Sequence, residues 1–164
     1  MKWLLLKMNG KVKMLKSNKK VLNIVMYAFF IMYLSLMIWE VFIGPYRSYT
    51  GRRRYNIYPF KTIVNYLLNS SKYNLNVIFI NLIANIITFI PLGFFISLLF
   101  IKNHKILNSI FPCILIILSI EMGQFIFNVG VLDIDDIILN GIGCILGIMI
   151  YKVTKRFWRD FNGI

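Results

Sequence analysis

The chain has 164 residues, a formal net charge of +13 and 59% hydrophobic residues, with a mean hydropathy of +0.70. Only 15% of its residues are charged, whereas a soluble domain carries about 25%, so the composition excludes an ordinary soluble domain and indicates an all-α integral membrane protein. The basic residues flank apolar runs and no nucleic-acid-binding motif accompanies them, so we expect membrane lipids, and no nucleic acid, as partners.

The first predicted element is a basic segment, residues 1–20, followed by an apolar helix at about residues 22–43. The segment carries seven lysines. A basic amphipathic helix on the membrane surface and an irregular basic tail explain it equally well. The apolar run exceeds the ~20 residues needed to cross a bilayer and no small-residue cleavage site follows it, so we expect an uncleaved transmembrane helix.

A long polar segment, about residues 44–74, comes next. It contains six basic residues and no acid. Pro59-Phe60 is expected to begin a short helix that cannot span the bilayer and lies at its interface. Guanidinium groups bind phosphate and carboxylate well, so this loop supplies candidate ligand-binding residues. They are Arg52, Arg53, Arg54 and Asn56.

The second predicted span covers about residues 75–101. Asn81, Asn85 and Thr88 are spaced i, i+4, i+7 and therefore share one helix face. Taken alone, this row is best interpreted as hydrogen bonding between membrane helices. Pro91 and Gly93 predict a kink or local distortion.

The third and fourth predicted spans cover about residues 106–127 and 136–151. Glu121 and Gln124 share one face of the third. Gly143 and Gly147 form a small-residue face on the fourth, which allows another helix to dock closely. With cytoplasmic termini, thirteen of the nineteen basic residues lie inside. We therefore expect both termini in the cytoplasm, a long first external loop, and one multi-pass domain, residues 1–164, in the plasma membrane.

Acidic residues concentrate between the third and fourth spans, inside apolar sequence. A carboxylate there is costly unless it is protonated, paired or facing water. The predicted topology brings this acidic turn to the same outer face as the arginine-rich loop, which predicts an outward-facing polar pocket. It leaves open whether Arg54 pairs with Glu121 or with Asp136. The further candidate ligand-binding residues are Asn85, Glu121, Gln124, Asp133, Asp136 and Asn140.

The acids could also serve in metal binding, helix capping or catalysis. Asp133, Asp135 and Asp136 could hold Mg²⁺ or Ca²⁺, but the ligand pattern of a calcium-binding loop is missing. Asp133 and Asp135 could instead cap the fourth helix. Glu121 is the candidate acid/base if the protein catalyses a reaction. We expect no cofactor.

Four short motifs in a fixed order resemble those of the VanZ-like family of small bacterial membrane proteins. The resemblance implies an envelope-associated membrane protein linked to low-level resistance to the glycopeptide teicoplanin. It implies no catalytic assignment. The motifs are Arg54-x-Asn56-x-x-Pro59-Phe60, Asn85-x-x-x-Phe89-x-Pro91-x-Gly93, Glu121-x-x-Gln124, and Gly130-x-x-Asp133-x-Asp135-Asp136-x-x-x-Asn140-x-x-Gly143-x-x-x-Gly147.

The leading functional hypothesis is a protein that lowers susceptibility to teicoplanin-like lipoglycopeptides through a pocket that binds an amphiphile. That amphiphile would be a lipid-linked wall precursor or the drug's acyl chain. One alternative is an enzyme acting on a lipid-linked pyrophosphate with Glu121 as acid/base. Another is a non-catalytic partner of envelope machinery that docks through Gly143 and Gly147.

Overall fold

The computed structural model describes residues 2–44, 53–69, 78, 80–100 and 106–161. These parts of the chain contain four helices long and apolar enough to cross a membrane. The predicted all-α membrane fold with four spanning helices is therefore confirmed. The four spans are Lys20–Phe42, Asn81–Leu99, Ile106–Phe127 and Ile134–Phe157.

The chain divides into two compact units, residues 1–36 and 37–164. The first consists of the greater part of α1 (Lys2–Phe42), whose backbone is one continuous helix. The basic start of the chain is thus helical rather than irregular. Within this unit the apolar side chains Leu22, Ile24 and Ile31 are about 60% exposed, as expected for a helix that faces lipid.

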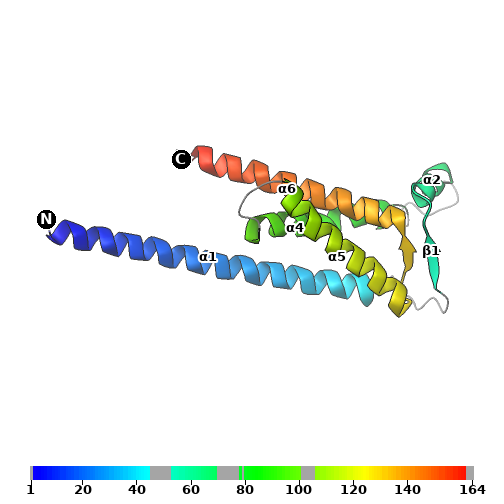
Figure 1. Cartoon of the computed structure of the whole chain (residues 1–164), viewed down its shortest axis with the longest axis horizontal. Helices are drawn as coiled ribbons and strands as arrows, with labels where there is room; N and C mark the ends of the chain where they lie inside the picture. Colours follow the sequence, from blue (N-terminus) through cyan, green and yellow to red (C-terminus); the bar gives the residue numbers. More distant parts are fainter. Residues whose placement is uncertain (1, 45–52, 70–77, 79, 101–105, 162–164) are drawn as a thin grey trace. The chain divides into compact units, whose positions relative to one another are not determined.

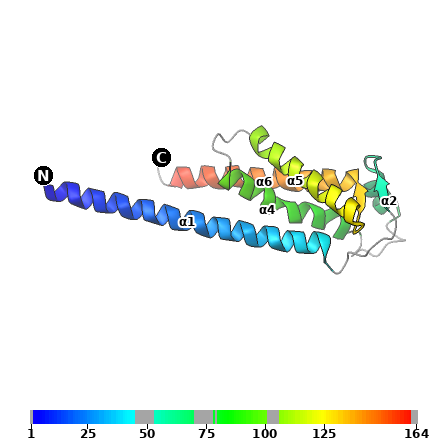
Figure 2. The same ribbon diagram turned by 60° about the horizontal axis from the view of Figure 1, so that its bottom comes forward.

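Three long helices make up most of the second unit (Figures 1 and 2). They are α4 (Asn85–Leu99), α5 (Ile106–Phe127) and α6 (Ile134–Phe161), and the π-helix η2 (Ile80–Ala84) precedes α4. Both views place the remaining elements at one end of these helices, where α5 leads through a short strand into α6. The remaining elements are β1 (Arg54–Asn56), α2 (Lys61–Leu68) and β2 (Val131–Asp133).

The two strands form a small parallel sheet that the sequence did not predict. Each has three residues, so neither carries the alternating pattern by which strands are recognised. The short helix expected after Pro59-Phe60 is present as α2. The sheet joins the loop after α1 to the turn between α5 and α6. Its register is Arg54↔Val131, Tyr55↔Leu132 and Asn56↔Asp133.

Glycine allows α4 and α6 to approach until their backbones touch. A Cβ atom at Gly147 would lie 1.9 Å from the Ile90 carbonyl oxygen, and one at Gly143 would lie 2.2 Å from that of Ile86. On the facing helix, a Cβ atom at Gly93 would lie 2.0 Å from the Cys144 carbonyl oxygen. The small-residue face predicted on the fourth span is therefore packed against α4 of the same chain.

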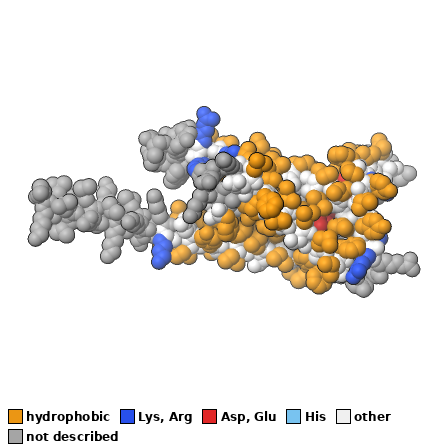
Figure 3. Space-filling view, viewed as in Figure 1, with side chains coloured by type: hydrophobic (Ala, Val, Ile, Leu, Met, Phe, Trp, Pro, Cys, Tyr) orange, Lys and Arg blue, Asp and Glu red, His pale blue; other side chains and the backbone are white. Residues whose placement is uncertain are grey.

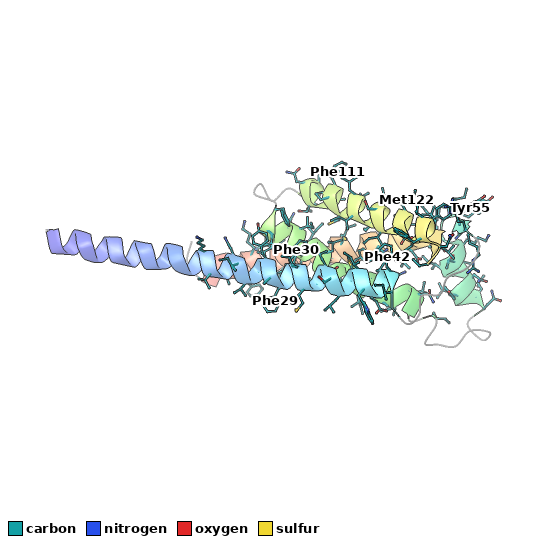
Figure 4. All side chains as sticks on the ribbon, turned by 90° about the horizontal axis from the view of Figure 1, so that it is seen from below. Phe29, Phe30, Phe42, Tyr55, Phe111 and Met122 are labelled. Carbon is teal, nitrogen blue, oxygen red and sulfur yellow. The ribbon has the colours of Figure 1, made fainter. Side chains whose placement is uncertain are left out.

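The outer surfaces of these helices are apolar. Figure 3 shows hydrophobic side chains over most of the visible face of the second unit, with very little acidic surface. In Figure 4, Phe111 and Met122 project from opposite halves of α5, and they are 65% and 46% exposed. Such side chains suit contact with lipid tails.

Two details of the spans differ from the sequence-based expectations. The predicted bounds of the third and fourth spans, 106–127 and 136–151, put Cys113 near the inner face of the membrane and Cys144 in its outer half. In the structure their side chains are hydrogen-bonded to each other and both are buried as free thiols. The expectation failed because the fourth span continues to Phe157, which brings Cys144 nearer the middle of the helix. The second difference concerns the distortion predicted at Pro91 and Gly93. The α4 helix continues through Pro91, and the turn that departs from α-helical geometry is η2, which precedes α4.

The close contact between α4 and α6 predicts that alanine at two glycines of α6 changes the free energy of unfolding differently. Gly147→Ala forces the backbones apart and should lower the free energy of unfolding by about 1–3 kcal/mol, the usual cost of overpacking. Gly141→Ala is the matched control, because a Cβ atom there meets nothing within 4 Å. It should leave stability unchanged or slightly raised, since alanine favours helix. Thermal unfolding in detergent measures both, and equal stability of the two variants would refute the contact.

Candidate functional site

The turn between α5 and α6 positions the candidate acids. The α5 helix ends where Asn128 adopts a left-handed conformation, with φ 57°, and the Val129 N–H donates to the Gln124 carbonyl at 3.1 Å. This reversal directs the chain into β2 alongside β1. Asp133 is the last residue of β2, and α6 begins immediately after it.

Asp133 connects three parts of this end of the molecule. Its Oδ1 accepts a hydrogen bond from Asn56 Nδ2 at 3.0 Å, and its Oδ2 accepts one from Thr62 Oγ1 at 2.6 Å. Its Oδ1 also accepts the Asp135 N–H at 2.9 Å, which makes Asp133 the N-cap of α6. The side chain is 6% exposed. The capping role predicted for Asp133 is present, and the same carboxylate also holds β1 and α2.

Asp135 caps a helix other than its own. Its carboxylate is fully buried and accepts the backbone N–H groups of Phe60 at 2.5 Å, Thr62 at 2.8 Å and Ile63 at 3.1 Å. These are the first N–H groups of α2, which lacks a side-chain cap of its own because Phe60 stands at the N-cap position with φ 65°. A carboxylate at a helix N-terminus is favourable for both the hydrogen bonds and the helix dipole.

We call Asp133 and Asp135, together with the loop groups that they bind, the clasp. Hydrogen bonds to a charged group are worth about 1.5–3 kcal/mol each. The clasp therefore holds residues 56–63 firmly against the start of α6. Sequence reasoning missed three of its members, which are Thr62 and the backbone N–H groups of Phe60 and Ile63. The Pro59-Phe60 motif lies beside them and was the available signal.

The candidate residues meet as asparagine–carboxylate pairs between different elements. The Asn140–Glu121 bond lies within the helices, is long and therefore weak, and joins two side chains that are each 3% exposed. Gln124, which is 4% exposed, donates to the Val41 carbonyl at 3.0 Å. The pairs are Asn56–Asp133 at 3.0 Å, Asn85–Asp136 at 2.7 Å and Asn140–Glu121 at 3.4 Å.

The two arginines of this loop that the structure describes, Arg53 and Arg54, stand apart from these pairs. Arg54 is exposed, and its guanidinium makes no hydrogen bond or ion pair with any residue that the structure describes, so neither Glu121 nor Asp136 pairs with it there. Arg53 is also exposed and lies over the Phe125 ring, 5.6 Å from its centroid. Arg52 lies outside the described residues. Both described guanidinium groups are thus accessible to an external anion.

The three aspartates face different partners. Asp133 binds Asn56 and Thr62, Asp135 binds the first turn of α2, and Asp136 binds Asn85. Within the described ranges, no group of three or more His, Cys, Asp or Glu side chains is placed to hold a metal ion. The geometry therefore gives no support to the cation site considered for these aspartates.

Comparisons with known proteins match a region that includes all four motifs. A family model described as VanZ/LLP1 matches residues 24–156. The chain is similar to Protein VanZ of Enterococcus faecium, with 30% identity over 128 residues, which covers 76% of this chain and 72% of the relative. No solved structure matches it.

The clasp predicts a local loss of order when Asp135 is removed. Asp135→Ala leaves three backbone N–H groups of α2 without their acceptor, so hydrogen exchange at Phe60, Thr62 and Ile63 should become at least tenfold faster, corresponding to about 1.4 kcal/mol or more of local stability. Lys61→Gln is the matched control, because Lys61 is exposed in the same turn and its ammonium lies over the Tyr58 ring rather than in the clasp. Mass spectrometry of the detergent-solubilised protein gives the rates. Unchanged exchange in Asp135→Ala would show that the cap does not hold α2.

Proposed function

The chain belongs to the VanZ/LLP1 family, and on this basis we propose that it is a cell-envelope protein of the plasma membrane that lowers bacterial susceptibility to teicoplanin-like lipoglycopeptides. The family match carries this proposal, because it covers residues 24–156 and therefore includes every described motif. The four membrane-spanning helices are consistent with it, since a protein of this kind must act at the membrane.

We propose that the working site is an outward-facing polar pocket built around the asparagine–carboxylate pairs. Support comes from the fact that all four motifs contribute side chains to them: Asp133, Asp136 and Asn140 come from one motif, and their partners come from the other three. The exposed Arg53 and Arg54 would meet the phosphate or carboxylate of the ligand. That ligand would be an amphiphile, either a lipid-linked wall precursor or the acyl-bearing drug.

The two alternative functions have less support. An enzyme acting on a lipid-linked pyrophosphate would use aspartates to hold a divalent ion, whereas Asp133 and Asp135 accept hydrogen bonds from the chain itself. Glu121 stays the candidate acid/base for such an enzyme. An assembly partner docking through Gly143 and Gly147 would need a face that α4 already covers.

Complementation of a deletion strain tests the proposed site. Glu121→Gln and Asp136→Asn each keep the side chain's shape but change its charge and donor pattern. Each should therefore return the inhibitory concentration of teicoplanin most of the way to that of the deletion strain. Glu40→Gln is the matched control, because Glu40 is an exposed carboxylate on α1 outside all four motifs, and it should complement fully.

Immunoblotting of membrane fractions establishes that the three variants are present in equal amounts. Full complementation by both Glu121→Gln and Asp136→Asn would rule out the proposed working site. Failure of the unmodified chain to complement would instead rule out the proposed role in susceptibility.

A further inference from the structure

The clasp fixes the depth at which the loop after α1 meets the membrane. Six residues separate the end of the span Ile106–Phe127 from Ile134, where the next span begins. Asp133 and Asp135 stand on either side of Ile134, and both hold the loop by hydrogen bonds. Residues 53–69, which we call the β1–α2 segment, are therefore tied to a span boundary. A bilayer has its headgroups at that level.

The β1–α2 segment presents an apolar outer face. On α2, Thr62, Ile63 and Tyr66 turn toward the rest of the unit and are half-buried. Leu67 and Leu68 point away and are 61% and 79% exposed. The rest of the segment also exposes aromatic rings, and Figure 4 shows Tyr55 at the same end of the unit. These rings belong to Tyr55, Tyr58 and Phe60, which are 67%, 65% and 57% exposed.

The charge of the segment is wholly positive. Arg53, Arg54 and Lys61 are exposed, and residues 53–69 include no acid. The aspartates that hold the segment are withdrawn from the surface, because Asp133 is 6% exposed and Asp135 is fully buried. Lys61 Nζ lies 5.4 Å from the centre of the Tyr58 ring, so one of these cations lies over an exposed aromatic ring.

We propose that the β1–α2 segment binds anionic phospholipid headgroups of the membrane in which the protein sits. Arg53, Arg54 and Lys61 contact the phosphates, while Leu67 and Leu68 enter the acyl-chain region beneath them. Tyrosine rings favour the boundary between these layers, and juxtamembrane cations are drawn to anionic lipid. The fixed depth, the apolar face and the absence of surface acid together favour lipid over a soluble anion. This inference shares Arg53 and Arg54 with the proposed ligand site, but its test does not measure drug susceptibility and can fail separately.

Spin labels on the full chain in lipid nanodiscs test the insertion of α2. Labels are attached to Leu67→Cys or, as the matched control, to Asn65→Cys. Both positions are exposed, and they lie about 200° apart around the helix. Collisions with oxygen should exceed those with a water-soluble nickel chelate severalfold at position 67, and the order should reverse at position 65. Dominant nickel collisions at both positions would overturn the proposal.

The same label at position 67 tests the headgroup charge. Replacing a third of the phosphatidylcholine with phosphatidylglycerol should move the label deeper, and Arg53→Gln, Arg54→Gln and Lys61→Gln together should abolish this shift. Lys155→Gln with Arg156→Gln, which removes exposed charges near the other end of α6, should retain it. The proposal fails if the triple variant keeps the shift, or if inorganic phosphate alone produces the shift in phosphatidylcholine discs.

Discussion

The burial of Asp135 is the constraint on which this end of the molecule depends. A carboxylate removed from water must receive hydrogen bonds from the protein, and the first turn of α2 supplies them through the N–H groups of Phe60, Thr62 and Ile63. The need is mutual, because α2 has no side-chain cap of its own. One interaction thereby satisfies a buried charge, begins a helix and fixes the loop to α6.

The residues at and just before the start of α6 organise the candidate site. Asp133, Asp136 and Asn140 succeed one another along the chain, and each bonds a residue from a different element. The glycines farther along α6 bring α4 close. Side-chain amides donate to Glu121, Asp133 and Asp136, and Arg53 and Arg54 are exposed, where an external anion can reach them. The proposed ligand recognition and the proposed lipid contact both need Arg53 and Arg54 to be exposed.

Much of this architecture was predictable from sequence, and the reasons for the failures are physical. The spans followed from apolar length, and the close helix contact followed from Gly143 and Gly147. Both Asp133 and Asp135 were candidates for capping α6, and only Asp133 does so, whereas Asp135 caps α2. This partner could not be predicted because its donors are backbone N–H groups, which have no signature in the sequence. The partner of Arg54 stayed open for a related reason: charge alone does not tell whether an acid meets a cation or an amide. The pairing of β1 with β2 was missed because a three-residue strand has no periodicity.

The cap of α2 comes from a distant residue of the same chain, and this also constrains the order in which the chain can fold. Asp135 follows Thr62 by 73 positions, so the ribosome must synthesise two further membrane spans before the acceptor for the first turn of α2 exists. An isolated helix of eight residues is unstable in water. We therefore expect α2 to become ordered only after the start of α6 has been synthesised. In this order of events, α2 forms later than the two membrane spans that follow it in the sequence.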